Sequence, residues 1–399
     1  MREKVLNDSN PALYNIIRDR ISQSPHQRIT FAEYMDLVLY HPEHGYYATN
    51  QVNIGEQGDF VTAPYLAADF GELLAEQFVE MWEILGQPAP FHLVEMGAGQ
   101  GILAADVLKY LHKHYFEFFE VLEYFIVEKA AGMIAEQKQI LKKSKYTENL
   151  HWCNWEEIPD NSIIGCCFSN ELVDALPVHQ IIFLENRLQE IFVSLDKNND
   201  FVEVAAKVST EKITEYFNLV GINLASGAYQ EGYRSEVNLA ALDWIKTVAN
   251  RLRRGYLLTI DYGYPAERYY SPLRRQGTLQ CYYQHSHHND PYKYIGRQDI
   301  TAHVDFTALE RQGELCGLKK LGFVQQGLFL MALGLGERVA AISNSETEDI
   351  TSLLRRRDAL HQLMNPMGLG GFGVLVQEKG LSEGERKRSL KGLKIPGMV

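Results

Sequence analysis

The sequence predicts an α/β fold with a largely parallel, helix-covered sheet. From residue 91 onward, strand-like apolar segments alternate with helical segments, an order typical of such sheets. The first strand ends at a turn with three glycines at every second position, Gly97, Gly99 and Gly101, which allows φ > 0 and close approach of a ligand. The strands are predicted at 91–96, 122–128, 163–169, 255–261 and 371–377, and the helices at 101–114, 130–142, 236–252, 304–317 and 350–363.

The remaining segments are predicted to extend this core, which comprises residues 89–177 and 236–380. Residues 1–88 are expected to form an N-terminal helical and loop segment that contributes to the site, with helices at 11–24 and 68–85. Thr30 is expected to cap a further helix, with Glu33 closing a capping box. Residues 178–235 are interpreted as an inserted antiparallel and helical segment. The basic tail, residues 381–399, is predicted to be solvated and disordered.

Composition limits the class of protein. The 399 residues are 46% hydrophobic and carry a net charge of −12, which disfavours a nucleic-acid phosphate track. The five cysteines show no C-x-x-C spacing, which favours free thiols in a reducing compartment over a zinc site. No apolar run reaches the ~18 residues of a membrane span. A cytoplasmic protein is therefore expected, or a mitochondrial matrix protein if the chain is a mature eukaryotic one.

The spacing of the glycines indicates which ligand the turn binds. A dinucleotide fingerprint would need its third glycine at Ile102, whereas here it is Gly101, and Glu95 precedes the first glycine by two residues. This E-x-G-x-G-x-G form resembles the first motif of S-adenosylmethionine-dependent methyltransferases. Glu128 ends the second strand, where an acid would accept hydrogen bonds from both ribose hydroxyls.

Six stretches along residues 11–377 resemble the MidA family, S-adenosylmethionine-dependent methyltransferases that include the mitochondrial complex I assembly factor. They are Leu39–Tyr47, Gly58–Pro64 with Phe70–Leu73, the Glu95 glycine loop, Ser169–Glu171 with Asp174–Pro177, Ile260–Tyr264 with Gly277–Gln280, and Asp299–Phe306. The resemblance implies a Rossmann-like class I methyltransferase core with S-adenosyl-L-methionine as cofactor. Its mitochondrial members are linked to symmetric dimethylation of an arginine in a complex I core subunit. A protein arginine, with a complex I-type subunit as candidate substrate, is therefore the expected acceptor.

Within these stretches, particular residues are expected to bind the cofactor or the acceptor. The expected cofactor contacts are Asp59, Thr62, Glu95, Gly97, Gly99, Gly101 and Glu128. The expected catalytic residues are Glu171 and Asp174, which would grip a guanidinium, Asn170, which would orient it, and His303, which would take a proton. Structural alternatives stay open, because Asp59 could be a turn residue, Asp174 a turn cap and His303 a hydrogen-bonded core histidine. Asp261 is expected to be structural.

Other interpretations are also open. A non-catalytic assembly factor that binds S-adenosylmethionine is a second possibility, because Tyr65-Leu66-Ala67 stands where the family usually has Glu-Ile-Ser. An NAD-dependent oxidoreductase is disfavoured by the glycine spacing. The acceptor could instead be a glutamine or a small molecule. The histidines at 285–288 lack acidic or cysteine partners at ligand spacing, so a polar loop and no metal site are expected.

Overall fold

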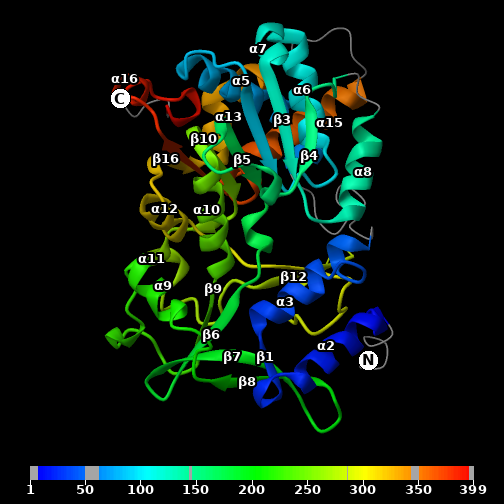
Figure 1. Cartoon of the computed structure of the whole chain (residues 1–399), viewed down its shortest axis with the longest axis vertical. Helices are drawn as coiled ribbons and strands as arrows, with labels where there is room; N and C mark the ends of the chain where they lie inside the picture. The colour runs from blue at the N-terminus through cyan, green and yellow to red at the C-terminus, as the bar shows by residue number, and fades with distance from the viewer. Residues whose placement is uncertain (1–7, 50–62, 143–145, 285, 343–349, 395–399) are drawn as a thin grey trace.

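The computed structural model describes residues 8–49, 63–142, 146–284, 286–342 and 350–394. A seven-stranded sheet occupies one half of the molecule, and a smaller sheet with the N-terminal helices occupies the other half (Figure 1). The strand order of the large sheet is β16-β17-β10-β5-β2-β3-β4. The bounds of these strands, in sequence order, are Phe91–Met96 (β2), Leu122–Val127 (β3), Leu150–Cys153 (β4), Ile163–Asn170 (β5), Leu252–Asp261 (β10), Lys319–Gln325 (β16) and Gly373–Lys379 (β17).

The five strands from β4 to β10 are parallel, whereas β17 is antiparallel to both β10 and β16. The chain builds β3 and β4 on one side of β2 and then returns to place β5 on the other side. The topological switch point therefore lies between β2 and β5, where open α/β sheets bind ligands at the carboxyl ends of their strands. The predicted α/β class is confirmed, and all five predicted strands are present. The short β4 and the more exposed β16 were not predicted.

Helices cover both faces of the sheet. One face packs against α5 (Asp69–Ile84), α6 (Ile102–His114), α13 (Gln326–Leu333) and α15 (Ile350–Met364), and the other against α10 (Leu239–Arg251) and α12 (Phe306–Leu315). The buried strands supply both cores because successive side chains point to opposite faces. Leu258, for example, belongs to the first core and its neighbour Leu257 to the second.

The second half of the molecule joins segments that are far apart in the sequence. Its sheet contains β1 (Arg28–Thr30), β6 (His179–Leu184), β7 (Arg187–Leu195), β8 (Phe201–Ala206) and β9 (Tyr233–Val237), all paired antiparallel. The helices α2 (Pro11–Gln23) and α3 (Phe31–Tyr40) share a hydrophobic core with Leu279, Cys281 and Ile300. Residues 263–305, expected in the methyltransferase core, therefore pack partly in this second half.

The start of α3 has the predicted cap. The hydroxyl of Thr30 accepts a hydrogen bond from the backbone N–H of Glu33 at 3.1 Å. The carboxylate of Glu33 pairs with Arg20 of α2 at 2.5 Å. One half of the predicted capping box is thus present, and the acid that would complete it joins two helices instead.

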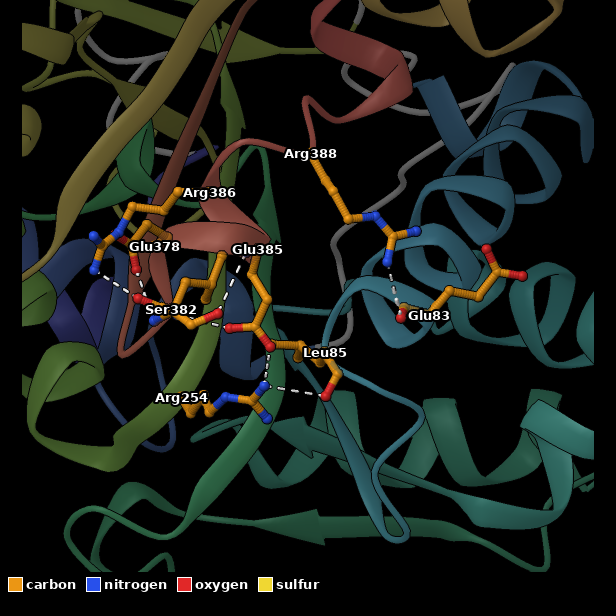
Figure 2. A network of polar contacts seen from close by, with 9 residues as sticks. Glu83, Leu85, Arg254, Glu378, Ser382, Glu385, Arg386 and Arg388 are labelled. Atoms are coloured by element: carbon orange, nitrogen blue, oxygen red, sulfur yellow. Dashed lines mark hydrogen bonds and ion pairs between the residues drawn. The ribbon is translucent and has the colours of Figure 1, made fainter.

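The C-terminal segment is packed as far as residue 394, which corrects the prediction of a disordered tail for residues 381–394. Residues 395–399 lie outside the described residues. Figure 2 shows that Arg254 contacts Glu385 and that Arg386 donates to Glu378 at 2.6 Å. Leu390 is 2% exposed, and the N–H of Gly392 donates to Gln77 of α5 at 2.9 Å. Among the basic residues that suggested solvation, Arg386 pairs with the buried Glu378, and Arg388 donates to the carbonyl oxygen of Glu83 at 3.4 Å. Leu390 supplies the apolar anchor.

Candidate active site

The glycine loop joins β2 to α6 at the switch point. Gly97, Gly99 and Gly101 have φ values of +69°, +52° and +83°, a left-handed conformation that L side chains rarely adopt. A Cβ at Gly97 would lie 2.7 Å from Leu172 Cδ1. The helix that follows has no side-chain cap at Gly101. Backbone conformation and neighbouring side chains therefore require glycine here, in addition to the ligand contact expected from the sequence.

Glu128 lies directly after β3, beside this loop. Its Oε1 accepts hydrogen bonds from the backbone N–H groups of Lys129 and Ala130 at 2.8 and 3.0 Å. Gln137 of α8 (Ala131–Leu141) donates to the carbonyl oxygen of Gly99 at 2.8 Å and to Glu128 Oε2 at 3.4 Å. Burial raises the pKa of Glu128, and these hydrogen bonds oppose that rise. A partly buried carboxylate is thus held next to the loop, which fits the ribose diol of S-adenosylmethionine.

Glu95 has a different environment from the one expected. It is 3% exposed, and Tyr124 of β3 donates to its Oε2 at 2.6 Å. Burial raises its pKa to about 7. The structure therefore shows Glu95 joining β2 to β3 beneath the loop, and its contact with the cofactor stays a prediction.

Three acidic side chains gather beyond the carboxyl ends of β5 and β10. Glu171 has a φ of +53°, and its N–H donates to the carbonyl oxygen of Ile260 at 2.9 Å. Burial and the charge of Asp174 raise the pKa of Glu171 to about 8. Burial likewise raises the pKa of Asp174 to about 6, and that of Asp261 well above its usual value. The charged neighbours that raise the pKa of Glu171 and Asp261 are other acids of this group, so the site favours a cation.

Asp261 holds the backbone around Asp174 through hydrogen bonds. Its Oδ2 accepts from the N–H groups of Val173 and Asp174 at 2.9 and 3.3 Å, and its Oδ1 accepts from that of Tyr262 at 2.9 Å. The short 3₁₀ turn η4 (Val173–Ala175) is held in this way. The structural interpretation of Asp261 agrees with these contacts.

Asp174 and Asn170 retain acceptor atoms for a ligand. Tyr262 donates to Asp174 Oδ2 at 2.5 Å, and Asn170 Nδ2 donates to Glu171 Oε1 at 3.3 Å. Within the described residues, Asp174 Oδ1 and Asn170 Oδ1 are buried and have no hydrogen-bond partner. Buried acceptors without donors are costly, so both atoms are suited to accept hydrogen bonds from a bound group.

His303 lies at the same site but is a weak base. Its ring stacks on Tyr264 at 5.2 Å and meets Tyr262 edge-on at 5.1 Å. Burial, followed by the charges of Arg274 and Arg268, lowers its pKa to about 4. The expectation of proton uptake rested on the usual near-neutral pKa of histidine, which this environment removes.

Several residues of the site were not singled out by the sequence. Tyr40 donates to the carbonyl oxygen of Ala175 at 2.9 Å, and Tyr47 donates to Asp299 Oδ1 at 2.9 Å. Tyr282 lies directly opposite Asp299 in the small sheet of β12 (Gln280–Tyr283) and β14 (Asp299–Thr301). All of these except Tyr282 lie in stretches that carried the family resemblance, which was the available signal.

The segment before α5 completes the description of the expected residues. Asp59 and Thr62 lie outside the described residues. The next residue, Ala63, forms a backbone hydrogen bond with Glu171 that lowers the pKa of this acid. Tyr65 is part of the departure from the family pattern, and the charge of Glu136 helps to raise its pKa. The carboxylate of Glu136 accepts a hydrogen bond from Gln100 of the glycine loop at 2.7 Å. The departure therefore lies beside the glycine loop.

The sheet order with one antiparallel strand, the glycine loop and the acid after β3 define a class I S-adenosylmethionine-dependent methyltransferase. A family model described as "Putative S-adenosyl-L-methionine-dependent methyltransferase" matches residues 73–324, and the chain belongs to this family.

Relatives and a solved structure agree with this assignment. The chain is 30% identical to "Protein arginine methyltransferase NDUFAF7 homolog, mitochondrial" of Drosophila melanogaster, over 76% of this chain and 71% of that protein. It is 26% identical to the Homo sapiens protein arginine methyltransferase NDUFAF7, mitochondrial, over 98% and 88% of the two chains. A Burkholderia thailandensis crystal structure matches with a TM-score of 0.83 and 30% identity, covering 98% of this chain and 96% of that one. Its description reads "likely methyl transferase", bound to S-adenosyl-homocysteine.

The described part of the chain has no helix long and apolar enough to cross a membrane. Within the same residues, no group of three or more His, Cys, Asp or Glu side chains is arranged to hold a metal ion.

Proposed function

We propose that the protein transfers methyl groups from S-adenosylmethionine to an arginine side chain of a protein. The observation that carries this proposal is the acidic group of Glu171, Asp174 and Asp261. Within the described residues, the buried atoms Asp174 Oδ1 and Asn170 Oδ1 have no hydrogen-bond donor. A guanidinium supplies five N–H donors and a positive charge in one plane. The names of the curated relatives, protein arginine methyltransferases, support the same acceptor.

One set of residues would bind the cofactor, and a second set would bind the arginine side chain. Glu128 and the glycine loop would hold the cofactor, which supplies the methyl group when bound. Glu171 and Asp174 would grip two N–H edges of the guanidinium and localise electron density on the third nitrogen. That nitrogen forms the new N–C bond as the C–S bond breaks and its electron pair stays on sulfur. Positioning carries most of the rate in such an in-line displacement.

The product nitrogen must lose a proton, and the acidic group provides an acceptor. The raised pKa values of Glu171 (about 8) and Asp174 (about 6) place both acids near neutrality, where a general base is most effective. His303, with its pKa lowered to about 4, is less suited. One of these two acids, in its ionised form beside the bound cation, would take the proton.

We further propose a complex I-type respiratory subunit as the protein substrate, by analogy with the mitochondrial relatives. In a bacterial source the reaction would then take place in the cytoplasm, and in a eukaryotic source in the mitochondrial matrix. The alternative of a non-catalytic assembly factor is not favoured, because the relatives carry enzyme names.

The proposal is tested by incubating the protein with isotope-labelled S-adenosylmethionine and purified complex I subunits, followed by peptide mass spectrometry. Labelled methylarginine is expected with the native protein, and its yield should fall at least about a hundredfold in Asp174→Asn, a loss typical for a group that orients the reacting atoms. The matched control is Asp243→Asn, which removes an exposed acid of α10. Label on glutamine, or equal yields from native and Asp174→Asn protein, would overturn the proposal.

A further inference from the structure

Asp299 is an acid of the second half of the molecule that the proposed mechanism does not use. It is 2% exposed and begins β14, opposite Tyr282 of β12. Tyr47, from the 3₁₀ turn η2 (Tyr46–Ala48), donates to its Oδ1 at 2.9 Å. The carboxylate is therefore oriented by a residue of the N-terminal segment.

A pair of tyrosines connects this carboxylate to the acidic group at the sheet. The rings of Tyr40 and Tyr47 stack with centroids 5.3 Å apart and planes 26° apart. One hydroxyl of the pair donates to Asp299, and the other donates to the carbonyl oxygen of Ala175, the residue after Asp174. The stacked pair thus joins the Asp299 carboxylate to the backbone that directly follows Asp174.

The backbone brings the same two regions together by a second route. The N–H of Ala302, one residue after β14, donates to the carbonyl oxygen of Asp174 at 2.9 Å. The strand β14 also packs directly against the turn η4 that carries Asp174. Asp299 therefore belongs to the border of the acceptor site, although it lies 125 residues further along the chain than Asp174.

The electrostatic environment of the neighbouring tyrosines agrees with this placement. Burial, followed by the charges of Asp174, Asp299 and Glu171, raises the pKa of Tyr282 to about 12. Burial, followed by the charges of Asp299, Asp174 and Glu128, raises the pKa of Tyr40 well above its usual value. The charges of Glu128, Asp174 and Asp299 therefore all act on Tyr40, and those of Asp174, Asp299 and Glu171 act on Tyr282.

We propose that Asp299 is a third acceptor-binding carboxylate, that Tyr47 positions it, and that it makes the site selective for arginine over lysine. This inference rests on the proposed function. Carboxylates on two sides suit a planar guanidinium, whose N–H groups point outward along several edges. An ammonium is a compact point charge with three donors at one atom, so it gains less from separated carboxylates.

The test measures binding of two short peptides to the full chain saturated with S-adenosylhomocysteine. The probes are acetyl-Gly-Arg-Gly-amide and acetyl-Gly-Lys-Gly-amide, and calorimetry gives their affinities. In Asp299→Asn, affinity for the arginine peptide should fall about tenfold or more, as expected for loss of a charged hydrogen-bond acceptor. The ratio of arginine-peptide to lysine-peptide affinity should also become smaller. Asp299→Glu should restore part of both.

Two further variants separate positioning from folding. Tyr47→Phe keeps the stacked ring and removes only the donor, so a smaller loss of arginine affinity, about threefold, is expected. The fall should occur with unchanged S-adenosylhomocysteine affinity and unchanged thermal midpoint. The exposed-acid variant Asp243→Asn should behave like the native protein.

The outcomes distinguish the two proposals. If Asp174→Asn loses the arginine peptide while Asp299→Asn binds both peptides as the native protein does, the role of Asp299 is overturned and the proposed function stands. If the native protein binds neither peptide at millimolar concentration, or does not prefer arginine, both are overturned. If Asp299→Asn fails to fold, Tyr47→Phe decides, because native arginine affinity and native preference for arginine in that variant overturn the inference.

Discussion

The phenol of Tyr262 donates a 2.5 Å hydrogen bond to Oδ2 of Asp174, while the neighbouring Asp261 accepts the backbone N–H of Asp174. The end of β10 thus sets both the backbone and the side chain of an acid that follows β5. Because these strands are adjacent and parallel, residues about 90 positions apart meet at one edge of the sheet. The order of the strands in the sheet therefore brings the acidic residues together.

Removing the Tyr262 hydroxyl should move the pH dependence of methyl transfer. The hydrogen bond from Tyr262 lowers the pKa of Asp174, which lies at about 6. In Tyr262→Phe this pKa should rise, so the acidic limb of the rate profile should move to higher pH by about one unit. Rates measured from pH 5 to 9 check this, with Tyr14→Phe, whose hydroxyl bonds the distant carbonyl oxygen of Asn199, as control. If the acidic limb of Tyr262→Phe stayed at the native pH, the hydrogen bond from Tyr262 would not set the pKa of Asp174.

Substituting the middle glycine of the loop should abolish cofactor binding. Gly99 has a φ of +52°, and a β-branched residue is strained there by roughly 1–2 kcal/mol. In Gly99→Val the added branch should also block the approach of the cofactor, so affinity for S-adenosylhomocysteine should fall at least about tenfold while the fold survives. Calorimetry measures this against Gly384→Val, since an added Cβ at Gly384 has no neighbour within 4 Å. Native affinity in Gly99→Val would show that the cofactor binds elsewhere.

Stability should respond to pH through Glu171. Its pKa is about 8 in the folded protein and near the usual 4.5 in the unfolded chain, so between these values the folded state binds more protons. Its contribution to stability is therefore present at low pH and is lost as the pH rises through 8. Between pH 5 and pH 8, the free energy of unfolding of Glu171→Gln should therefore rise relative to that of the native protein, by on the order of 3 kcal/mol.

Urea titrations at both pH values measure this difference in free energy. The matched control is Glu117→Gln, an exposed acid of α7 (Phe116–Val121). A difference between Glu171→Gln and native protein that is the same at pH 5 and pH 8 would refute the raised pKa.

The packed C-terminal segment should contribute to stability. Leu390 is 2% exposed and joins the core that α5 and α13 share, so Leu390→Ala should lower the free energy of unfolding by about 2–4 kcal/mol. Leu273→Ala, at a residue that is 93% exposed, should change it by less than about 0.5 kcal/mol. Equal urea midpoints for the two variants would indicate that the segment is not anchored in solution.

Local signals in the sequence identified most of the methyltransferase core. The buried strands are continuous apolar runs, and their ends were marked by the glycines at 97–101 and by the acids Glu128 and Glu171. Hydrophobic period and turn chemistry depend on neighbouring residues, so they can be recognised in a sequence. The prediction for residues 381–394 was wrong because the charges of this segment are visible in the sequence and its packing is not. Glu378, the acid that pairs with Arg386, is buried, and Leu390 reaches the core.

By itself, then, the sequence determined the α/β class, the glycine loop and the acids that follow β3 and β5. Only the tertiary structure placed Asp299 and the Tyr40–Tyr47 pair beside Asp174 and gave His303 a pKa of about 4. The physical reason is that burial and electrostatic fields depend on every element packed around a group. These surroundings come from segments that meet only when the two halves of the molecule have folded together.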